Sequence, residues 1–208
     1  MREYENCGGV VADVHFIRDG AYHMKAKENP DDKRKYYIWE TMRWAEAAIL
    51  QRDRMESAQH QQLAVYTHPG TSLRQRLKAA NLFHSEKCFF VYAFYMALQH
   101  AKGLKESFQI DTEIIRKYNK KEMDAIKDMR DMLTHADEYL APLIKGKPGG
   151  NHPERYFAQK DGYISDPSGV YGDISKGNAV LGARLEVDTA CRNLKELLAD
   201  MEKLAFNV

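Results

Sequence analysis

The longest apolar run of this chain is Cys88-Phe89-Phe90-Val91-Tyr92-Ala93-Phe94-Tyr95-Met96-Ala97-Leu98. Wound into a helix, it is apolar on every side, and such a helix is normally surrounded by other helices. It is too short to cross a bilayer. The run therefore predicts the centre of a helical bundle, with its aromatic side chains in the core and not on a base-stacking platform.

Helices are also expected before this run. Apolar residues recur at helical spacing from about residue 31 to Tyr66, which predicts a rod of roughly 50 Å closed by a Pro-Gly turn at 67–70. Ser72 and Gln75 then form a capping-box signal for the central helix. Trp39 and Trp44 should point to different sides of the first helix, one toward the core and one toward an interface.

The chain after the apolar run predicts two more helices. A third long helix is expected from Asp111, as its N-cap, to Leu140, and the last helix is expected to be capped by Asp188. The core face of the third helix should comprise Ile115, Tyr118, Ile126, Met129, Leu133, Ala136 and Leu140.

Between these two helices the chain is rich in Gly and Pro, and residues 145–187 are expected to form a small β insert. It should contain a hairpin turning at 160–162 and a strand over 179–187. Residues 8–28 fit either a helix or a hairpin, and a helix is favoured. The predicted fold is mainly α: one domain over 1–208, an antiparallel bundle of four to five helices with a β-hairpin insert before the last helix.

Composition excludes several classes of protein. The 208 residues include 31 Lys+Arg and 30 Asp+Glu, so the net charge of +1 gives no global attraction to DNA or to an anionic membrane. Cys7, Cys88 and Cys191 are widely spaced, which predicts neither a disulfide framework nor a cysteine zinc site. The N-terminus lacks the pattern of a signal peptide. We expect a cytoplasmic protein with no membrane partner and no cofactor.

No Gly-rich phosphate loop, metalloprotease motif or nucleophile-elbow motif occurs in the sequence. The most informative polar cluster is 128–139, near the end of the expected third helix. On an ideal helix Arg130 and His135 are about 140° apart and about 7.5 Å along the axis. Between them in angle fall Thr134, Lys127, Lys120 and Arg116.

The Arg and His therefore flank a basic strip that suits an anion. An Arg can hold a phosphate through two N–H groups and a His can transfer a proton near neutral pH, which are the functions that metal-free RNA cleavage requires. This favours Arg116, Lys120 and Lys127 as nucleic-acid-binding residues.

Arg130 and His135 at R-x4-H spacing, late in an all-helical bundle, resemble the signature of the HEPN (higher eukaryotes and prokaryotes nucleotide-binding) superfamily. The segment 130–140 is also similar to bacterial proteins of unassigned function with an R-D-x-L-x-H-x-D-E-Y sequence. Asp131 stands where active members commonly carry Asn, and an acidic residue there is expected to pair with Arg130 or to oppose an approaching phosphate.

The resemblance implies a homodimer in which two Arg–His pairs line one cleft. It also implies metal-independent endoribonuclease activity, often in toxin–antitoxin or defence systems, or RNA binding without catalysis. In that scheme His135 is the general acid/base, Arg130 the phosphate clamp, Thr134 an extra donor and Asp131 an orienting group for His135. RNA and an antitoxin protein are the implied partners.

Two other interpretations stay open. Asp131, His135 and Glu138 lie within about a 60° arc of one helix face and, with His60 or His100 from another helix, would make a metal site. Alternatively, the cluster is a solvated helix face of a non-catalytic bundle that acts through protein interaction. The sequence leaves open whether the protein is an enzyme.

Overall fold

The computed structural model describes residues 30–134, 158–160, 163–165 and 169–206. The expectations for residues 8–28 and for the whole segment 135–157 lie outside these residues. That segment includes His135, Ala136, Glu138 and the expected helix end at Leu140.

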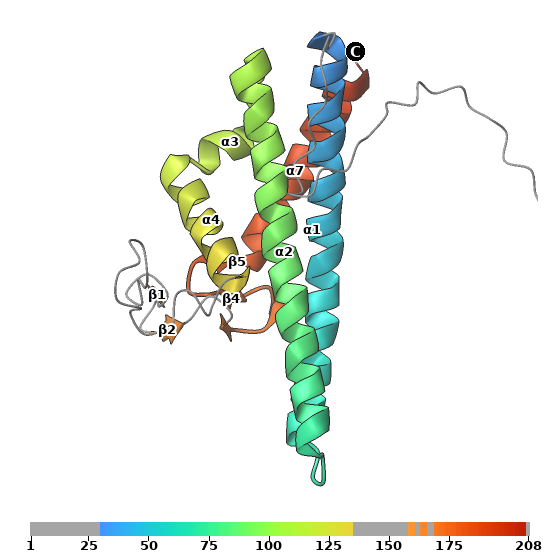
Figure 1. The fold of residues 1–208 in the computed structure, drawn as a ribbon, viewed down its shortest axis with the longest axis vertical. Coiled ribbons are helices and arrows are strands. Elements are labelled where there is room, and N and C mark those ends of the chain that lie inside the picture. Colours follow the sequence, from blue (N-terminus) through green and yellow to red (C-terminus); the bar gives the residue numbers. More distant parts are fainter. Residues whose placement is uncertain (1–29, 135–157, 161–162, 166–168, 207–208) are drawn as a thin grey trace, which may run out of the picture.

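A long helical hairpin forms one layer of the molecule (Figure 1). It consists of α1 (Pro30–Thr67) and α2 (Leu73–Phe108), which run antiparallel and side by side. The expected capping box is present: the Gln75 backbone N–H donates to Ser72 Oγ over 3.3 Å, and the Ser72 N–H donates to Gln75 Oε1 over 2.9 Å. Because both caps satisfy N–H groups that a helix start leaves unpaired, α2 begins sharply after the turn.

The centre of the bundle lies along α2, as the sequence predicts. Phe90, Phe94 and Leu98 are fully buried, and the first two rings are stacked with centroids 6.2 Å apart. Near the end of α2, Gly103 lies against the ring of Tyr37 so closely that a Cβ there would overlap it. The glycine therefore sets how closely the two long helices approach.

Burial around the apolar run is less complete than expected. Phe89 is 63% exposed and Tyr92 is 40% exposed, because they lie on a side of the hairpin that no described element covers. The two tryptophans do point to different sides: Trp39 is exposed, whereas Trp44 packs edge-on against Tyr92 with ring centroids 5.5 Å apart.

The expectation of a single helix, the third in the chain, from Asp111 to Leu140 is wrong at the N-terminal end of that helix. The chain forms α3 (Glu113–Lys117), breaks at Tyr118, and resumes as α4 (Lys120–Thr134). Asn119 causes the restart: its Oδ1 accepts from the Lys121 N–H over 2.9 Å, and Glu122 Oε2 accepts from the Asn119 N–H over 2.8 Å. This is a second capping box, and Asp111 caps nothing.

The last helix, α7 (Val187–Phe206), packs against α1. The prediction that Asp188 is the N-cap of this helix is wrong. Asp188 lies in the first turn, where its Oδ1 accepts a hydrogen bond from Arg52 over 3.2 Å. Arg52 also donates to the Ile174 carbonyl over 2.8 Å and pairs with Glu56. One arginine of α1 therefore fastens both α7 and the segment before it.

The β insert is confirmed. The predicted hairpin is β1 (Ala158–Lys160) paired antiparallel with β2 (Tyr163–Ser165). A second antiparallel sheet has the order β3-β4-β5, made of Val170–Tyr171, Val180–Leu181 and Leu185–Glu186, with a short 3₁₀ turn, η1 (Ile174–Lys176), after β3. The strand expected over 179–187 is two strands, because Gly182 and Ala183 take left-handed φ values of 55° and 53° and reverse the chain.

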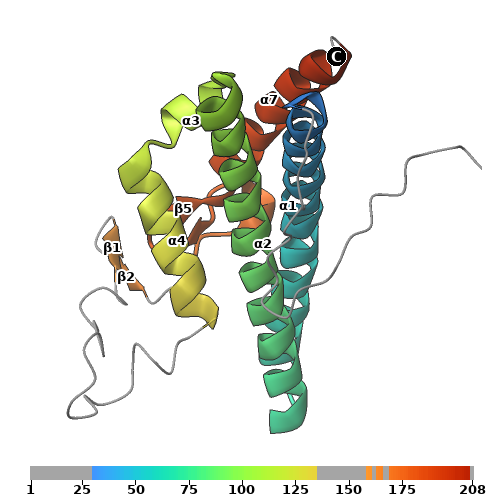
Figure 2. The same ribbon diagram turned by 45° about the horizontal axis from the view of Figure 1, so that its top comes forward.

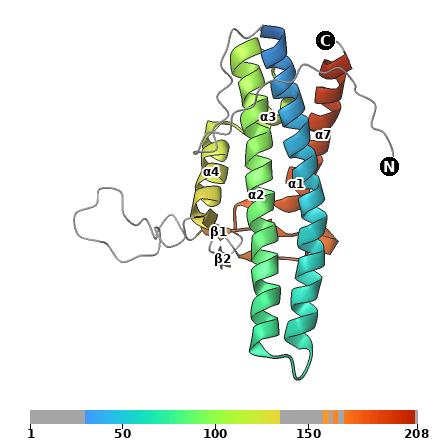
Figure 3. The same cartoon turned by 45° about the vertical axis from the view of Figure 1, so that its right-hand side comes forward.

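The described residues thus form a mainly helical bundle of five α-helices with a small β insert before the last helix. α4 runs beside α2, joined to it at the top through α3 (Figure 2), and the loop end of the hairpin projects beyond α4 and α7 (Figure 3). Nowhere among the described residues is a helix both long and apolar enough to cross a bilayer.

Candidate nucleic-acid interface

Arg130 lies on the face of α4 that packs against α2. Its guanidinium carbon is 4.4 Å from the ring centroid of Tyr95, a residue of α2 that is 9% exposed. Arg130 Nε donates to Asp131 Oδ1 over 2.9 Å, and Nη2 donates to the same oxygen. The ring and the carboxylate therefore hold the guanidinium in place, and the pairing anticipated from the acidic neighbour occurs.

This arrangement leaves part of Arg130 available. A guanidinium has five N–H donors, of which described residues take two. The Asp131 charge offsets that of Arg130, so a bound phosphate would be held by the remaining N–H groups with less electrostatic gain than a lone arginine offers.

Thr134 closes the described part of α4. Its Oγ1 donates back to the carbonyls of Arg130 and Asp131 over 3.0 and 3.1 Å. A threonine hydroxyl has one proton, so the predicted role as an extra donor requires this hydroxyl to rotate. The predicted roles of His135 as general acid/base and of Asp131 as its orienting group stay predictions, because His135 lies outside the described residues.

The three expected nucleic-acid-binding residues meet in one cleft of about 600 Å³ between α2 and the α3–α4 pair. We call it the basic cleft and define it by Lys102 and Lys105 of α2, Arg116 of α3, and Lys120 and Lys127 of α4. Tyr95, beneath Arg130, also lines it, and the acidic residues of its lining are Glu106 and Asp124. Five cations against two carboxylates leave an excess of three positive charges in a chain whose net charge is +1.

Some of these charges are already paired. Asp111, beside the cleft, is 3.0 Å from Lys105 Nζ and 3.5 Å from Arg116 Nε, and Lys102 is 3.4 Å from Glu106. Such exposed pairs contribute little and exchange readily with a ligand anion. Lys120 and Lys127, both exposed, form no ion pair within the described part of the chain.

A polar tether to α7 fixes the far wall of the cleft. Lys117 Nζ donates to Asn193 Oδ1 over 3.2 Å and to Glu196 over 2.8 Å, and Asn193 Nδ2 donates to Tyr118 Oη over 3.2 Å. The Tyr118 ring packs edge-on against Phe94, and burial raises the pKa of Tyr118 above its ordinary value. Tyr118 is therefore a structural residue at the kink between α3 and α4, not a free stacking surface.

Other chemistry has little support in the described residues. They contain no group of three or more His, Cys, Asp or Glu side chains placed to hold a metal ion. His60 is exposed on α1, and His100 lies beside the rings of Tyr36 and Tyr37, where burial lowers its pKa. The metal interpretation also needs His135 and Glu138, so it stays untested.

Cys88 and Cys191, the cysteines among the described residues, do not form a nucleophilic site. Burial raises the pKa of Cys88, and it raises that of Cys191 to about 11, so both are thiols near neutral pH. His84 Nε2 lies 3.5 Å from Cys88 Sγ. The His84 side chain is exposed at a second cleft, where the hairpin meets β3.

Comparisons of the chain with protein families, curated proteins and solved structures find no match. The relation to the HEPN superfamily therefore stays a prediction carried by residues 130–140.

The sequence did not indicate Lys102 and Lys105 as partners of the basic strip. Their three-residue spacing puts them on one side of α2, and the sequence could have indicated this shared face. The sequence does not show that this side of α2 packs against α3 and α4. Lys87, on α2 at the second cleft, was likewise not predicted as a site residue.

Proposed function

We propose that this protein is a HEPN-like RNA-binding protein that holds the phosphates of single-stranded RNA in the basic cleft. The observation that carries the proposal is the convergence of five basic side chains from three helices on one cleft of about 600 Å³. Lysines and arginines along a groove bind nucleic acid mainly through its backbone. The volume lies in the range of about 300–1,000 Å³ typical of ligand clefts.

The proposal extends to metal-independent RNA cleavage. Arg130 lies over Tyr95, which lines the basic cleft, so its remaining N–H groups are beside a strand bound there. Arg130 would stabilise the pentavalent phosphate and His135 would transfer the proton between the 2′-hydroxyl and the leaving oxygen. A homodimer and an antitoxin partner, both implied by the resemblance, belong to this proposal.

A second candidate function, protein interaction without catalysis, is favoured by one observation. Phe89 and Tyr92 are exposed on the side of the hairpin that no described element covers, and exposed aromatic side chains are enriched at protein interfaces. Oligomeric mass separates the candidates in part, since a strict monomer removes the two-site cleft of the nuclease scheme.

RNA binding is tested by a fluorescence anisotropy titration of a short labelled single-stranded RNA. The change is Lys120→Gln with Lys127→Gln, and the matched control is Lys195→Gln with Lys203→Gln on the exposed side of α7. Each lost phosphate contact lowers the slope of log affinity against log salt by about 0.7 for single strands, so we expect a drop of about 1.4 and weaker binding. If the protein with Lys120→Gln and Lys127→Gln shows unchanged RNA affinity and an unchanged salt slope, the proposal is contradicted.

Cleavage has a separate test. Wild type and His135→Ala are incubated with the labelled RNA, with and without EDTA, and the products are resolved by gel electrophoresis. Loss of a general acid/base should slow cleavage at least about a hundredfold, in EDTA as well as without it. Cleavage that EDTA abolishes would favour the metal interpretation. Equal behaviour of the two proteins would leave RNA binding without catalysis.

A further inference from the structure

The loop end of the hairpin, residues 57–85, projects beyond α4 and α7 (Figure 3). Apolar side chains lie open to solvent there: Leu73 is 73% exposed, and Leu63, Tyr66 and Leu77 are each about half exposed. Apolar side chains that are exposed together mark binding surfaces, whereas scattered ones do not. The loop end is therefore a candidate interaction surface.

The leucines of α2 belong to a stripe that is buried further along the same helix. Its members recur every three or four residues: Leu73, Leu77, Ala80, His84, Lys87, Val91 and Tyr95. From Lys87 onward these residues are buried, and Arg130 of α4 lies over the Tyr95 ring. This side of α2 therefore accepts a helix, and toward the turn at 67–72 no described element covers it.

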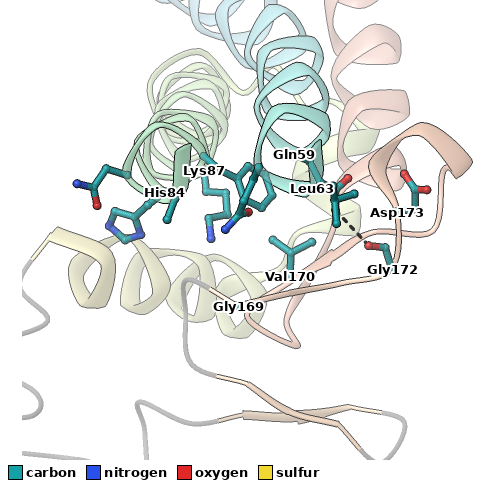
Figure 4. Close-up of a pocket in the computed structure, with 12 residues that line it drawn as sticks. Gln59, Leu63, His84, Lys87, Gly169, Val170, Gly172 and Asp173 are labelled. Atoms are coloured by element: carbon teal, nitrogen blue, oxygen red, sulfur yellow. Dashed lines mark hydrogen bonds between the residues drawn. The ribbon is translucent and has the colours of Figure 1, made fainter. Parts of the chain in front are cut away.

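α1 contributes to the same side of the loop end. Leu63 of α1 and His84 of α2 both line the second cleft, so they share one side of the hairpin (Figure 4). Tyr66 follows Leu63 along α1, and its ring centroid is 5.9 Å from the guanidinium carbon of Arg76. We call the exposed apolar surface the tip face; its members are Leu63, Tyr66, Leu73 and Leu77.

The charges beside the tip face are all positive. Residues 57–85 contain Arg74, Arg76 and Lys78 and no Asp or Glu, although 30 of the 208 residues of the chain are acidic. By helical geometry Arg74 and Lys78 lie to one side of the two leucines of α2, and Arg76 lies to the other. Among the described residues these three cations form no ion pair. The surface therefore complements carboxylates carried next to apolar side chains.

Other occupants match these features less well. A second copy of the chain, joined tip face to tip face, would bring like charges together with no carboxylate between them. RNA would use the cations and leave the leucines in water. A bilayer would first meet the polar turn at 67–72, because the leucines lie along the side of the hairpin and not at its end.

We propose that the tip face binds an acidic amphipathic helix of a partner protein, laid along α2 in continuation of α4. Apolar residues of that helix at positions i, i+3 or i+4, and i+7 contact the leucines, and its carboxylates pair with the three cations. The stripe from Leu73 to His84 is about 17 Å long, which accommodates about three helical turns. This inference does not depend on RNA binding.

The test is a fluorescence anisotropy titration of the full chain with a labelled synthetic peptide of about 20 residues, or between five and six helical turns. Leucines follow one face of the peptide, and glutamate and alanine occupy the other positions. Two matched peptides have lysine in place of glutamate, or the same composition with the leucines moved off one face. We expect saturable binding of the first peptide and at least about tenfold weaker binding of the other two.

Variants of the tip face locate the binding. Leu77→Gln should weaken it at least about tenfold, because an apolar contact is lost. Leu50→Gln, at an equally exposed leucine of α1 outside the tip face, is the matched control and should leave it unchanged. Arg74→Gln with Lys78→Gln should weaken it about threefold or more at low salt. All four positions are exposed, so these proteins keep their fold.

The proposal is overturned if the acidic peptide does not saturate, if either matched peptide binds as well, or if the tip variants bind like wild type. It is also overturned if Leu77→Gln weakens binding of the labelled RNA, or of vesicles of phosphatidylcholine and phosphatidylglycerol, in place of the peptide. The protein with Lys120→Gln and Lys127→Gln must retain peptide binding, which separates the tip face from the basic cleft. Loss of peptide binding in that protein would place the peptide in the basic cleft and overturn the proposal as well.

Discussion

The two clefts of this molecule both use lysines of α2, yet they present them in opposite ways. In the basic cleft, Lys102 and Lys105 are joined by cations from α3 and α4. In the second cleft, of about 640 Å³ where the hairpin meets β3, a single lysine, Lys87, is almost fully buried beside the ring of Phe83. Exposed charges in a row attract a long polyanion with little discrimination, whereas a buried charge is held by its surroundings in the folded chain.

We expect the largest effect from salt concentration, which should change RNA binding at the basic cleft. Raising salt from about 50 to about 200 mM is expected to weaken RNA binding about tenfold, because two or three phosphate contacts each release counterions. Anisotropy titrations of the labelled RNA at several salt concentrations over this range check the prediction. An RNA affinity that does not change with salt would contradict binding through phosphates.

Arg52→Met should affect the second cleft and leave the basic cleft unchanged. The substitution removes hydrogen bonds to the Ile174 carbonyl and to Asp188, which fasten η1 and α7 to α1. We expect a loss of about 2 kcal/mol of unfolding free energy, with unchanged RNA affinity.

Urea denaturation and the RNA titration check this prediction. Arg43→Met is the matched control, since its exposed pair with Glu40 should contribute less than about 1 kcal/mol. An Arg52 variant as stable as the Arg43 variant would show that the tether does not support the cleft.

Asn119→Ala should affect only the basic cleft, and we expect its effect to be the smallest of those predicted here. It removes the cap of α4 next to Lys120, at a cost of about 1 kcal/mol, or about 3 °C in Tm. RNA binding should weaken slightly because the first turn of α4 frays. Ser72→Ala removes the corresponding cap of α2 and should give a similar shift in a thermal melt without changing RNA affinity. If both variants bind RNA with equal affinity, the α4 cap does not contribute to RNA binding in the basic cleft.

Local signals in the sequence were enough to predict most of the fold. The Ser72 capping box, the Pro-Gly turn and the apolar run place α1 and α2, and the turn at 160–162 places β1 and β2. The break at Tyr118 was missed because the apolar spacing from Ile115 to Ile126 continues across it, although Asn119 and Glu122 carry a capping signal. At this position the capping residues, and not the apolar spacing, determine where the helix begins.

The site was less predictable, because it depends on packing between helices. Arg116, Lys120 and Lys127 were expected on one stripe of one helix, and they line one cleft from two helices. Lys102 and Lys105 join them through the fold of the hairpin, which no local pattern encodes. Lys87 follows the polar residues 84–86 and directly precedes the apolar run, so nothing in the sequence indicated that it would be buried.

The central claim, that RNA lies in the basic cleft, is tested most directly by photo-crosslinking. A single-stranded RNA containing 4-thiouridine is irradiated with the full chain, and the adducts are mapped by mass spectrometry. The account predicts adducts in residues 95–106 and 116–127 that disappear in the Lys120→Gln and Lys127→Gln protein. Adducts confined to residues 57–85, the loop end of the hairpin, which contains Arg74, Arg76 and Lys78 and no Asp or Glu, would contradict it.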